Sequence, residues 1–257
     1  MQAQDLALEK DELKQILRDL KSQSDVETVK QRAEKLLKVV DPRVLSLAEQ
    51  ELLKEGFTQD ELRSLCDMHL QLLSGKIEEG PASDVSHPIT ILQEEHKVIQ
   101  RYLAKLEEIA QKLKTSKNFT LPQDDMAELR NVSQMLVEAE SHHKREEDAL
   151  FPRLEQQGIT GPPSIMRLEH DELRKRKKAF KELTETAGKL NQADFAKKLT
   201  ELESFIVPTL RSHIFKEDNI LYPTALQAIS ENEWSTIKRE FDEIGYCPFT
   251  PQHVTAR

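Results

Sequence analysis

Beyond residue 87, apolar residues recur at intervals of three and four along four long stretches, about 88–115, 122–155, 162–189 and 194–228. This spacing places them on one side of an α-helix, which is the pattern of an amphipathic helix. Short breaks rich in Pro, Gly, Asn and Asp separate the stretches. Because short connections make neighbouring long helices antiparallel, we expect residues 87–228 to form an up-down-up-down four-helix bundle, and the chain to be all-α.

The residues on either side of the predicted bundle have shorter helical patterns. Residues 1–76 read as a module of small helices with capping signals such as Ser24 with Glu27. Residues 77–86 are small, polar and Pro/Gly-containing, which indicates a linker. After the bundle, residues 229–257 predict one short helix, which begins at Ser230 and is ended by Gly245, followed by a loose tail over 248–257.

Composition narrows the classes of partner. The formal net charge of -9 gives no general attraction for nucleic acid or an anionic membrane. The N-terminus lacks the apolar segment of a secretory signal, and no apolar run approaches the roughly 20 residues that span a bilayer. We therefore expect a cytoplasmic protein. Its two cysteines, Cys66 and Cys247, are too few for a disulfide framework and are expected to be free thiols.

Histidines and glutamates interrupt the apolar stripes in a repeated pattern. His142 and Glu146 are four residues apart, as are His213 and Glu217, and each glutamate is followed at the same distance by Leu-aromatic-Pro. Residues four apart share one helix face. The first and third stretches also match one another, with His96 aligned to His170. In an antiparallel bundle all four histidines therefore lie at one height.

Four imidazoles and two carboxylates in a bundle core are costly to bury unless a metal ion compensates them. A single zinc ion needs four ligands, so six donors from four helices fit two metals with open positions. Imidazole with bridging carboxylates suits iron, manganese or zinc. We expect two non-haem iron ions, held by residues of the two repeats: His96, His142, Glu146, His170, His213 and Glu217.

Two alternatives concern the register of the ligands. His143 with Glu147 offers the same spacing as His142 with Glu146. The internal repeat selects His142 and Glu146, and leaves His143 as a fifth nitrogen ligand or a flank of the site, because one residue turns a side chain by about 100°. The four histidines of the repeat can also be separate core or surface residues.

Other candidates lie outside this set. His87 precedes Pro88 at the start of the first long helix, about 13 Å along the axis from His96 at 1.5 Å per residue. It can approach Cys66 and His69, which together with Cys247 suggest either a second site or ordinary packing. The basic run 174–178 suggests either a nucleic-acid contact or, as we prefer, a solvated helix surface.

The bundle residues resemble a hemerythrin-like domain of the HHE cation-binding family. The matching segments contain His96 in Glu-Glu-His, His142 and Glu146 in His-His-Lys-Arg-Glu-Glu-Asp-Ala-Leu-Phe-Pro, His170 in Leu-Glu-His-Asp-Glu-Leu, and His213 with Glu217. The resemblance implies a di-iron centre that binds or responds to dioxygen, nitric oxide or peroxide. Residues 8–75 resemble the DUF438 module, which carries no known chemistry.

The histidine count shifts the functional expectation. Oxygen-carrying hemerythrins use five histidines, whereas the sequence places four. This difference favours a sensor of dioxygen, nitric oxide or redox state over a carrier. The alternative is a di-iron protein that repairs iron-sulfur clusters or donates iron, or an enzyme that detoxifies peroxide or nitric oxide. We also expect the iron site at the bundle end joined by the N-terminal module, which would then pass the iron state to a signalling partner.

Overall fold

The computed structural model describes residues 85–115 and 121–255, together with residues 11, 12, 14–16, 18, 19, 48, 51, 52 and 55–57 of the N-terminal region. The predicted boundaries at residues 76, 86 and 228 stay predictions. Cys66 and His69 lie outside the described residues, as do most of the predicted N-terminal helices and linker.

The four predicted helical stretches are confirmed, and no strand occurs among the described residues. The first is one helix, α5. The second contains α6, α7, a π-helical turn η1 and α8; the third contains α9 and the 3₁₀ turn η2; the fourth contains α10, the π-helical turn η3 and α11. Their bounds are Pro88–Thr115 (α5), Gln123–Glu138 (α6), Glu140–Arg145 (α7), Glu146–Leu150 (η1), Phe151–Gln156 (α8), Gly161–Glu185 (α9), Ala187–Lys189 (η2), Gln192–Lys216 (α10), Glu217–Leu221 (η3) and Tyr222–Ala228 (α11).

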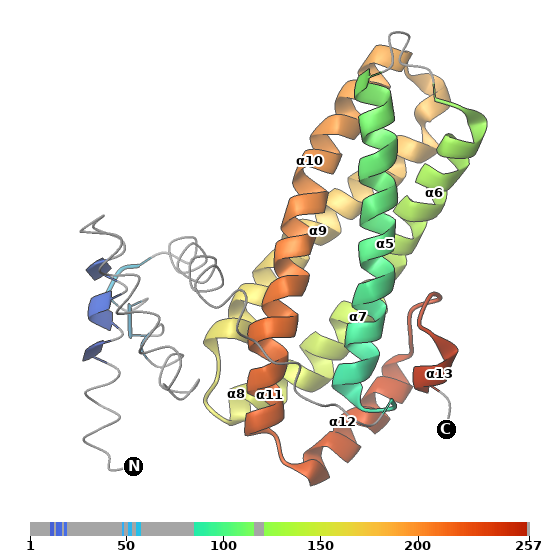
Figure 1. Ribbon diagram of the computed structural model, residues 1–257. Helices are drawn as coiled ribbons and strands as arrows, with labels where there is room; N and C mark the ends of the chain where they lie inside the picture. The colour runs from blue at the N-terminus through green and yellow to red at the C-terminus, as the bar shows by residue number, and fades with distance from the viewer. Residues whose placement is uncertain are drawn as a thin grey trace. The chain divides into compact units, whose positions relative to one another are not determined.

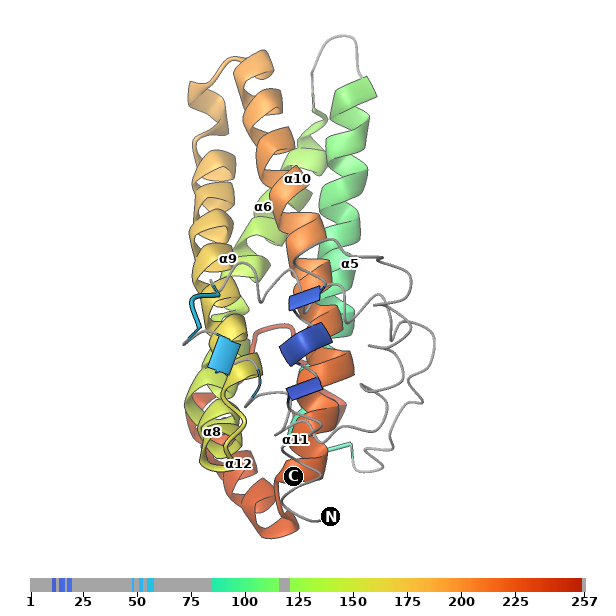
Figure 2. The same cartoon turned by 90° about the vertical axis from the view of Figure 1, so that its left-hand side faces the viewer.

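The chain falls into two compact units, each made of segments that are separate in sequence. One contains Ala82–Leu150, Arg167–Phe215 and Glu231–Arg257, and the other contains Met1–Pro81, Phe151–Met166 and Lys216–Ser230. The first unit holds α5, α6 and most of α9 and α10, which lie side by side as an up-down-up-down bundle (Figures 1 and 2). In the second unit, η3 continues directly into α11, whose residues Tyr222 and Ala225 are buried.

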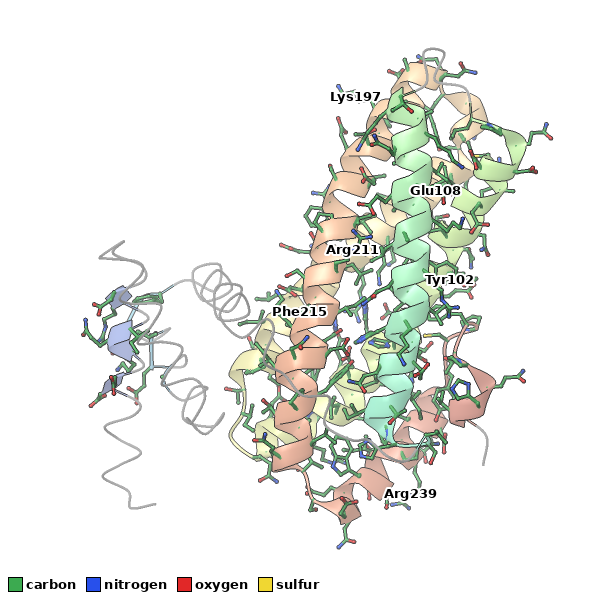
Figure 3. The ribbon with its side chains drawn as sticks, in the orientation of Figure 1. Tyr102, Glu108, Lys197, Arg211, Phe215 and Arg239 are labelled. Atoms are coloured by element: carbon green, nitrogen blue, oxygen red, sulfur yellow. The ribbon has the colours of Figure 1, made fainter. Side chains whose placement is uncertain are left out.

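The bundle core consists of the apolar stripes that the periodicity predicts. Leu103, Leu136, Phe180 and Leu199 come from the four different helices and are fully buried. Burial of a side chain of this size stabilises the fold by about 1.5–3 kcal/mol. At the surface, Arg211 of α10, labelled in Figure 3, reaches Glu107 of α5 at 2.9 Å. None of the described helices is long and apolar enough to cross a membrane.

The C-terminal segment differs in part from the prediction. The expected short helix is present as α12, Glu231–Ile244, and Gly245 follows it with a φ of 90°. The predicted loose tail is wrong for residues up to 255, because a further helix, α13, spans Gln252–Thr255 and Val254 is buried. The ring of Phe249 contacts the ring of Tyr102 on α5 at 5.6 Å. These contacts order a segment that has no periodic pattern of its own.

Candidate metal centre

The two predicted glutamate ligands occupy equivalent backbone positions. Glu146 is the first residue of η1 and Glu217 is the first residue of η3, and both side chains are buried. Six residues after each glutamate comes a proline, which has no N–H to donate and whose ring displaces the carbonyl four residues earlier, inside the π-helical turn. Short π-helical turns within α-helices are frequent at functional sites.

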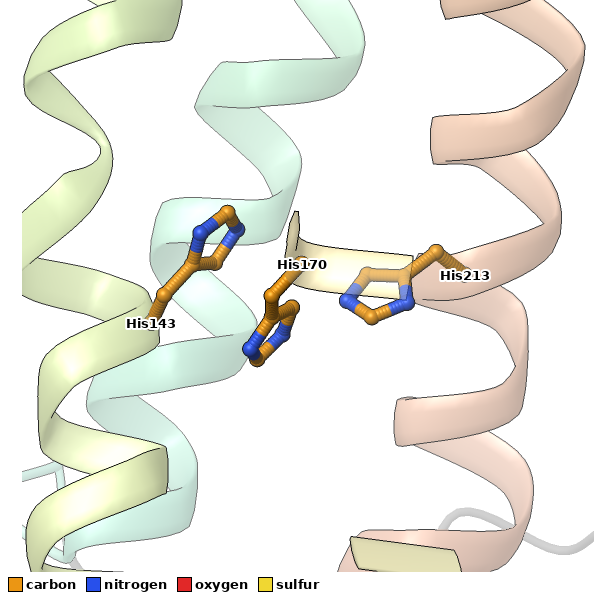
Figure 4. Close-up of side chains that lie close together, drawn as sticks. All are labelled: His143, His170 and His213. Atoms are coloured by element: carbon orange, nitrogen blue, oxygen red, sulfur yellow. The ribbon is translucent and has the colours of Figure 1, made fainter. Parts of the chain in front are cut away.

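One group of three buried histidines gathers between α7, α9 and α10. His143, His170 and His213 each offer a ring nitrogen, and these three nitrogens lie within 4.8 Å of one another (Figure 4). The rings of His143 and His170 are stacked, with their centroids 4.0 Å apart and their planes at 11°. The His213 ring meets His170 edge-on, at 4.7 Å and 69°.

A second, buried pair of histidines lies beside the first group. Nε2 of His96 on α5 is 3.2 Å from Nε2 of His142 on α7. The Glu146 carboxylate connects the two groups, since its Oε2 is 3.6 Å from Nε2 of His142 and 3.4 Å from Nε2 of His170. Glu217 is also one of the buried residues that could hold a metal ion. The structure thus places all six predicted ligands and His143 in buried, metal-competent positions.

Three further carboxylates contact the Nδ1 atoms of histidines in the site. Glu95 lies 2.7 Å from Nδ1 of His142, Glu147 lies 2.7 Å from Nδ1 of His170, and Glu169 lies 2.8 Å from Nδ1 of His213. Metal-binding histidines usually donate their second ring N–H to such a partner, which fixes the tautomer and the ring orientation. Sequence reasoning missed Glu95 and Glu169, although each directly precedes a predicted histidine ligand. Glu147, the alternative ligand of the sequence analysis, has this outer position instead.

Two of these outer carboxylates are themselves paired with arginines. Nη2 of Arg145 donates to both Glu95 oxygens at 2.6 Å, and Nη2 of Arg174 donates to Glu147 at 2.8 Å. Burial alone would raise the pKa of the Glu95 carboxyl, but the hydrogen bond from His142 and the charge of Arg145 lower it to about 2. The pKa of Glu147 is also about 2, because His170 and Arg174 outweigh burial. Both carboxylates are therefore ionised and accept the histidine protons.

This proton placement decides whether a metal fits. With the proton on Nδ1, the Nε2 atom of His142 or His170 carries a lone pair and no hydrogen. Each of these lone pairs then faces the Glu146 oxygen, which is also an acceptor, at 3.6 and 3.4 Å. Acceptors that face one another in a buried site are compensated by a cation between them. The donor set therefore fits a metal centre.

His143 differs from the other histidines in what surrounds it. Among the described residues, its Nδ1 atom has no hydrogen-bond partner, and its Nε2 lies 3.5 Å from Nζ of the buried Lys177. Burial and the neighbouring His170 and Lys177 hold the pKa of His143 well below its usual range. A neutral ring is the form that binds metal. Stacking on His170, rather than a carboxylate, sets its orientation.

The remaining sequence candidates lie elsewhere in the structure. His87 accepts the Ile89 N–H at 3.2 Å, and its ring lies 4.7 Å from Trp234. It belongs to no metal-competent group within the described part of the chain. The basic run 174–178 is only partly a solvated surface: Lys177 is buried, and Arg174 binds Glu140 and Glu147. The solvated interpretation is therefore wrong for these two residues.

Cys247 is a buried thiol whose reactivity can be tested. Burial, followed by the charge of Glu95, raises the pKa of the thiol to about 11. A rise of about 2 units in pKa lowers the thiolate fraction at neutral pH about 100-fold. In a Cys66→Ser variant, we expect iodoacetamide to label Cys247 at least about 100-fold more slowly in the folded protein than in urea. Equal labelling rates in the two conditions would contradict this structure of the C-terminal segment.

Together these features define a class of protein: a four-helix bundle whose core carries a metal centre of histidines and carboxylates. The sequence profile of the Hemerythrin HHE cation binding domain matches residues 87–225, more than half of the chain. The chain therefore belongs to the hemerythrin HHE cation-binding family, and its histidine and carboxylate ligands suit iron. The profile of DUF438, a family of unknown function, matches residues 13–79.

A curated relative shares part of the chain. The iron-sulfur cluster repair protein YtfE of Salmonella schwarzengrund (strain CVM19633) is 33% identical over 93 residues. The matched segment is 35% of this chain and 42% of that protein, so the chain spans less than half the length of this relative.

Proposed function

We propose that the chain holds two iron ions in a non-haem centre that binds a small ligand such as dioxygen or nitric oxide. The observation that carries this proposal is the division of five histidines into a pair and a group of three, with Glu146 between them. One metal ion cannot use that many donors, whereas two can share them and keep open positions.

The proposed ligands follow from this division. His96 and His142 bind one iron, and His143, His170 and His213 bind the other. Glu146 bridges the two ions. We assign Glu217 as a second bridge, because it is buried, follows His213 by four residues along one continuous helix, and begins a π-helical turn as Glu146 does.

Each part of the protein has a defined task in this proposal. Iron supplies reversible ligand binding and redox chemistry. Glu95, Glu147 and Glu169 hold the Nδ1 protons of three histidines and so keep Nε2 available for the metal. The side chains of the proposed ligands are buried, which limits the access of water to the centre. The fifth histidine, which the sequence did not place with certainty, removes the difference in histidine count from oxygen-carrying hemerythrins.

The test is metal analysis with ultraviolet-visible spectra of anaerobically purified protein, before and after addition of dioxygen or nitric oxide. We expect about two irons per chain and a reversible spectral change. A His213→Ala, Glu217→Ala double variant should lose the metal, because each replacement removes a donor. Fewer than one metal per wild-type chain, or full retention in the double variant, would contradict the proposal.

A second function is favoured by the relative, whose name describes repair of iron-sulfur clusters. Repair or iron donation requires iron that leaves the centre, whereas a sensor or binder keeps it. We propose sensing or ligand binding first and repair as the alternative. Chelator competition separates the two: release of iron to a ferrous chelator within minutes supports donation, and retention over hours supports binding. Transfer of the iron state to a signalling partner through the N-terminal module stays a prediction.

A further inference from the structure

The C-terminal segment packs against the side of the bundle that carries His96 and His142. Helix α12 contacts α5, α7 and η1, and α13 contacts α5 (Figure 1). Trp234, Ile237 and Phe241 are the buried residues of α12. This segment follows the bundle in sequence and contributes none of the proposed metal ligands. Its contacts nevertheless reach the centre.

Thr250 forms the most direct of these contacts. Its hydroxyl donates a hydrogen bond to Oε1 of Glu95, although the two residues are 155 positions apart in sequence. The other oxygen of the same carboxylate, Oε2, accepts the Nδ1 proton of His142 at 2.7 Å. A two-bond path thus leads from the C-terminal segment to a proposed iron ligand.

The arginine that balances Glu95 is also held by this segment. The Arg145 guanidinium lies over the rings of Phe241 and Tyr246, at 5.3 Å and 4.9 Å from their centroids. Its Nη2 lies 3.8 Å from Sγ of Cys247, in addition to its bonds to Glu95. The Glu95 carboxylate and the Arg145 guanidinium therefore both contact residues of the segment 241–250.

We infer that Thr250 is a positioning residue for the metal centre, and that residues 241–250 set how His142 is presented to its iron. This inference rests on the proposed function. The Thr250 hydroxyl holds Oε1 of Glu95, so that the other oxygen, Oε2, stays aligned with Nδ1 of His142. Its removal leaves only Arg145 and His142 to fix the Glu95 carboxylate. The change disturbs only one of the two proposed iron positions, because the other three histidines have their own contacts.

The test compares Thr250→Val with Thr250→Ser and with Thr255→Val, a matched control whose hydroxyl donates to the nearby Gln252 carbonyl. Loss of an outer-sphere partner typically costs 10- to 100-fold in metal affinity. We therefore expect Thr250→Val to release one of two irons to a chelator about 10-fold more easily than wild type. The second iron should be retained, and the other two variants should behave as wild type.

Two further measurements keep the outcomes distinct. Equal urea midpoints for Thr250→Val and Thr255→Val will show that any change in iron affinity is not general unfolding. If wild-type protein holds two irons and Thr250→Val releases both at the wild-type rate with an unchanged spectrum, the inference is overturned while the proposed function stands. Wild-type protein that binds no iron would overturn both.

Discussion

Replacement of Glu146 by glutamine is expected to remove both of the proposed metal ions from the protein. The Glu146 carboxylate lies between the two histidine groups, at 3.6 Å from His142 and 3.4 Å from His170. Glutamine keeps the shape but removes the negative charge that two cations would share. Because loss of an outer partner alone costs 10- to 100-fold in metal affinity, we expect loss of this ligand to cost more than about 100-fold. Metal content after gel filtration, measured by mass spectrometry, will show it.

A matched control for this variant lies two residues away. Asp148 is in the same π-helical turn but its side chain is exposed. Asp148→Asn removes the same charge and should keep the full metal content. If Glu146→Gln retains two ions while its circular dichroism is unchanged, the bridging assignment is wrong and the two histidine groups do not share this carboxylate.

Replacement of Arg145 by methionine is expected to lower the free energy of unfolding by about 3–5 kcal/mol, because it leaves the Glu95 carboxylate buried without its cation. Both side chains are fully buried, with a relative exposure of 0% each. Urea denaturation monitored by circular dichroism measures the change. Lys144→Met is the matched control, since this neighbouring side chain is exposed and its loss should change stability by less than about 0.5 kcal/mol.

A double variant identifies the source of the effect. When both members of a buried pair are replaced by apolar residues, most of the penalty disappears, because no charge is left uncompensated. Arg145→Met with Glu95→Leu should therefore be more stable than Arg145→Met alone. A double variant as unstable as the sum of its single variants would show instead that the two side chains act independently.

The choice between His142 and His143 shows how a helix supplies both halves of the site. Consecutive residues on a helix are turned by about 100° from one another. His142 therefore faces His96 on α5, while His143 faces His170 and His213 on α9 and α10. The repeat in the sequence selected His142 as a member of the pattern. It left His143 open, because the repeat has no second histidine at the corresponding position of the fourth helix.

The residues that contact the proposed ligands were the hardest to predict from the sequence. The sequence analysis assigned no role to Glu95 and Glu169, and it interpreted Lys177 as part of a solvated basic run. All three are buried in the fold. Their burial depends on which helices pack against them, which is a relation between distant parts of the chain and leaves no local periodic signal.

The sequence by itself determined the all-α class, the limits of the four long helices to within a few residues, and the six repeated ligand candidates. These follow from local periodicity, because a spacing of three and four fixes which residues share a helix face. Only the tertiary structure showed that His143 lies beside His170 and His213, that Glu95, Glu147 and Glu169 contact the histidines, and that Thr250 reaches Glu95. Such contacts join residues up to 155 positions apart, and are set by packing between helices rather than within them.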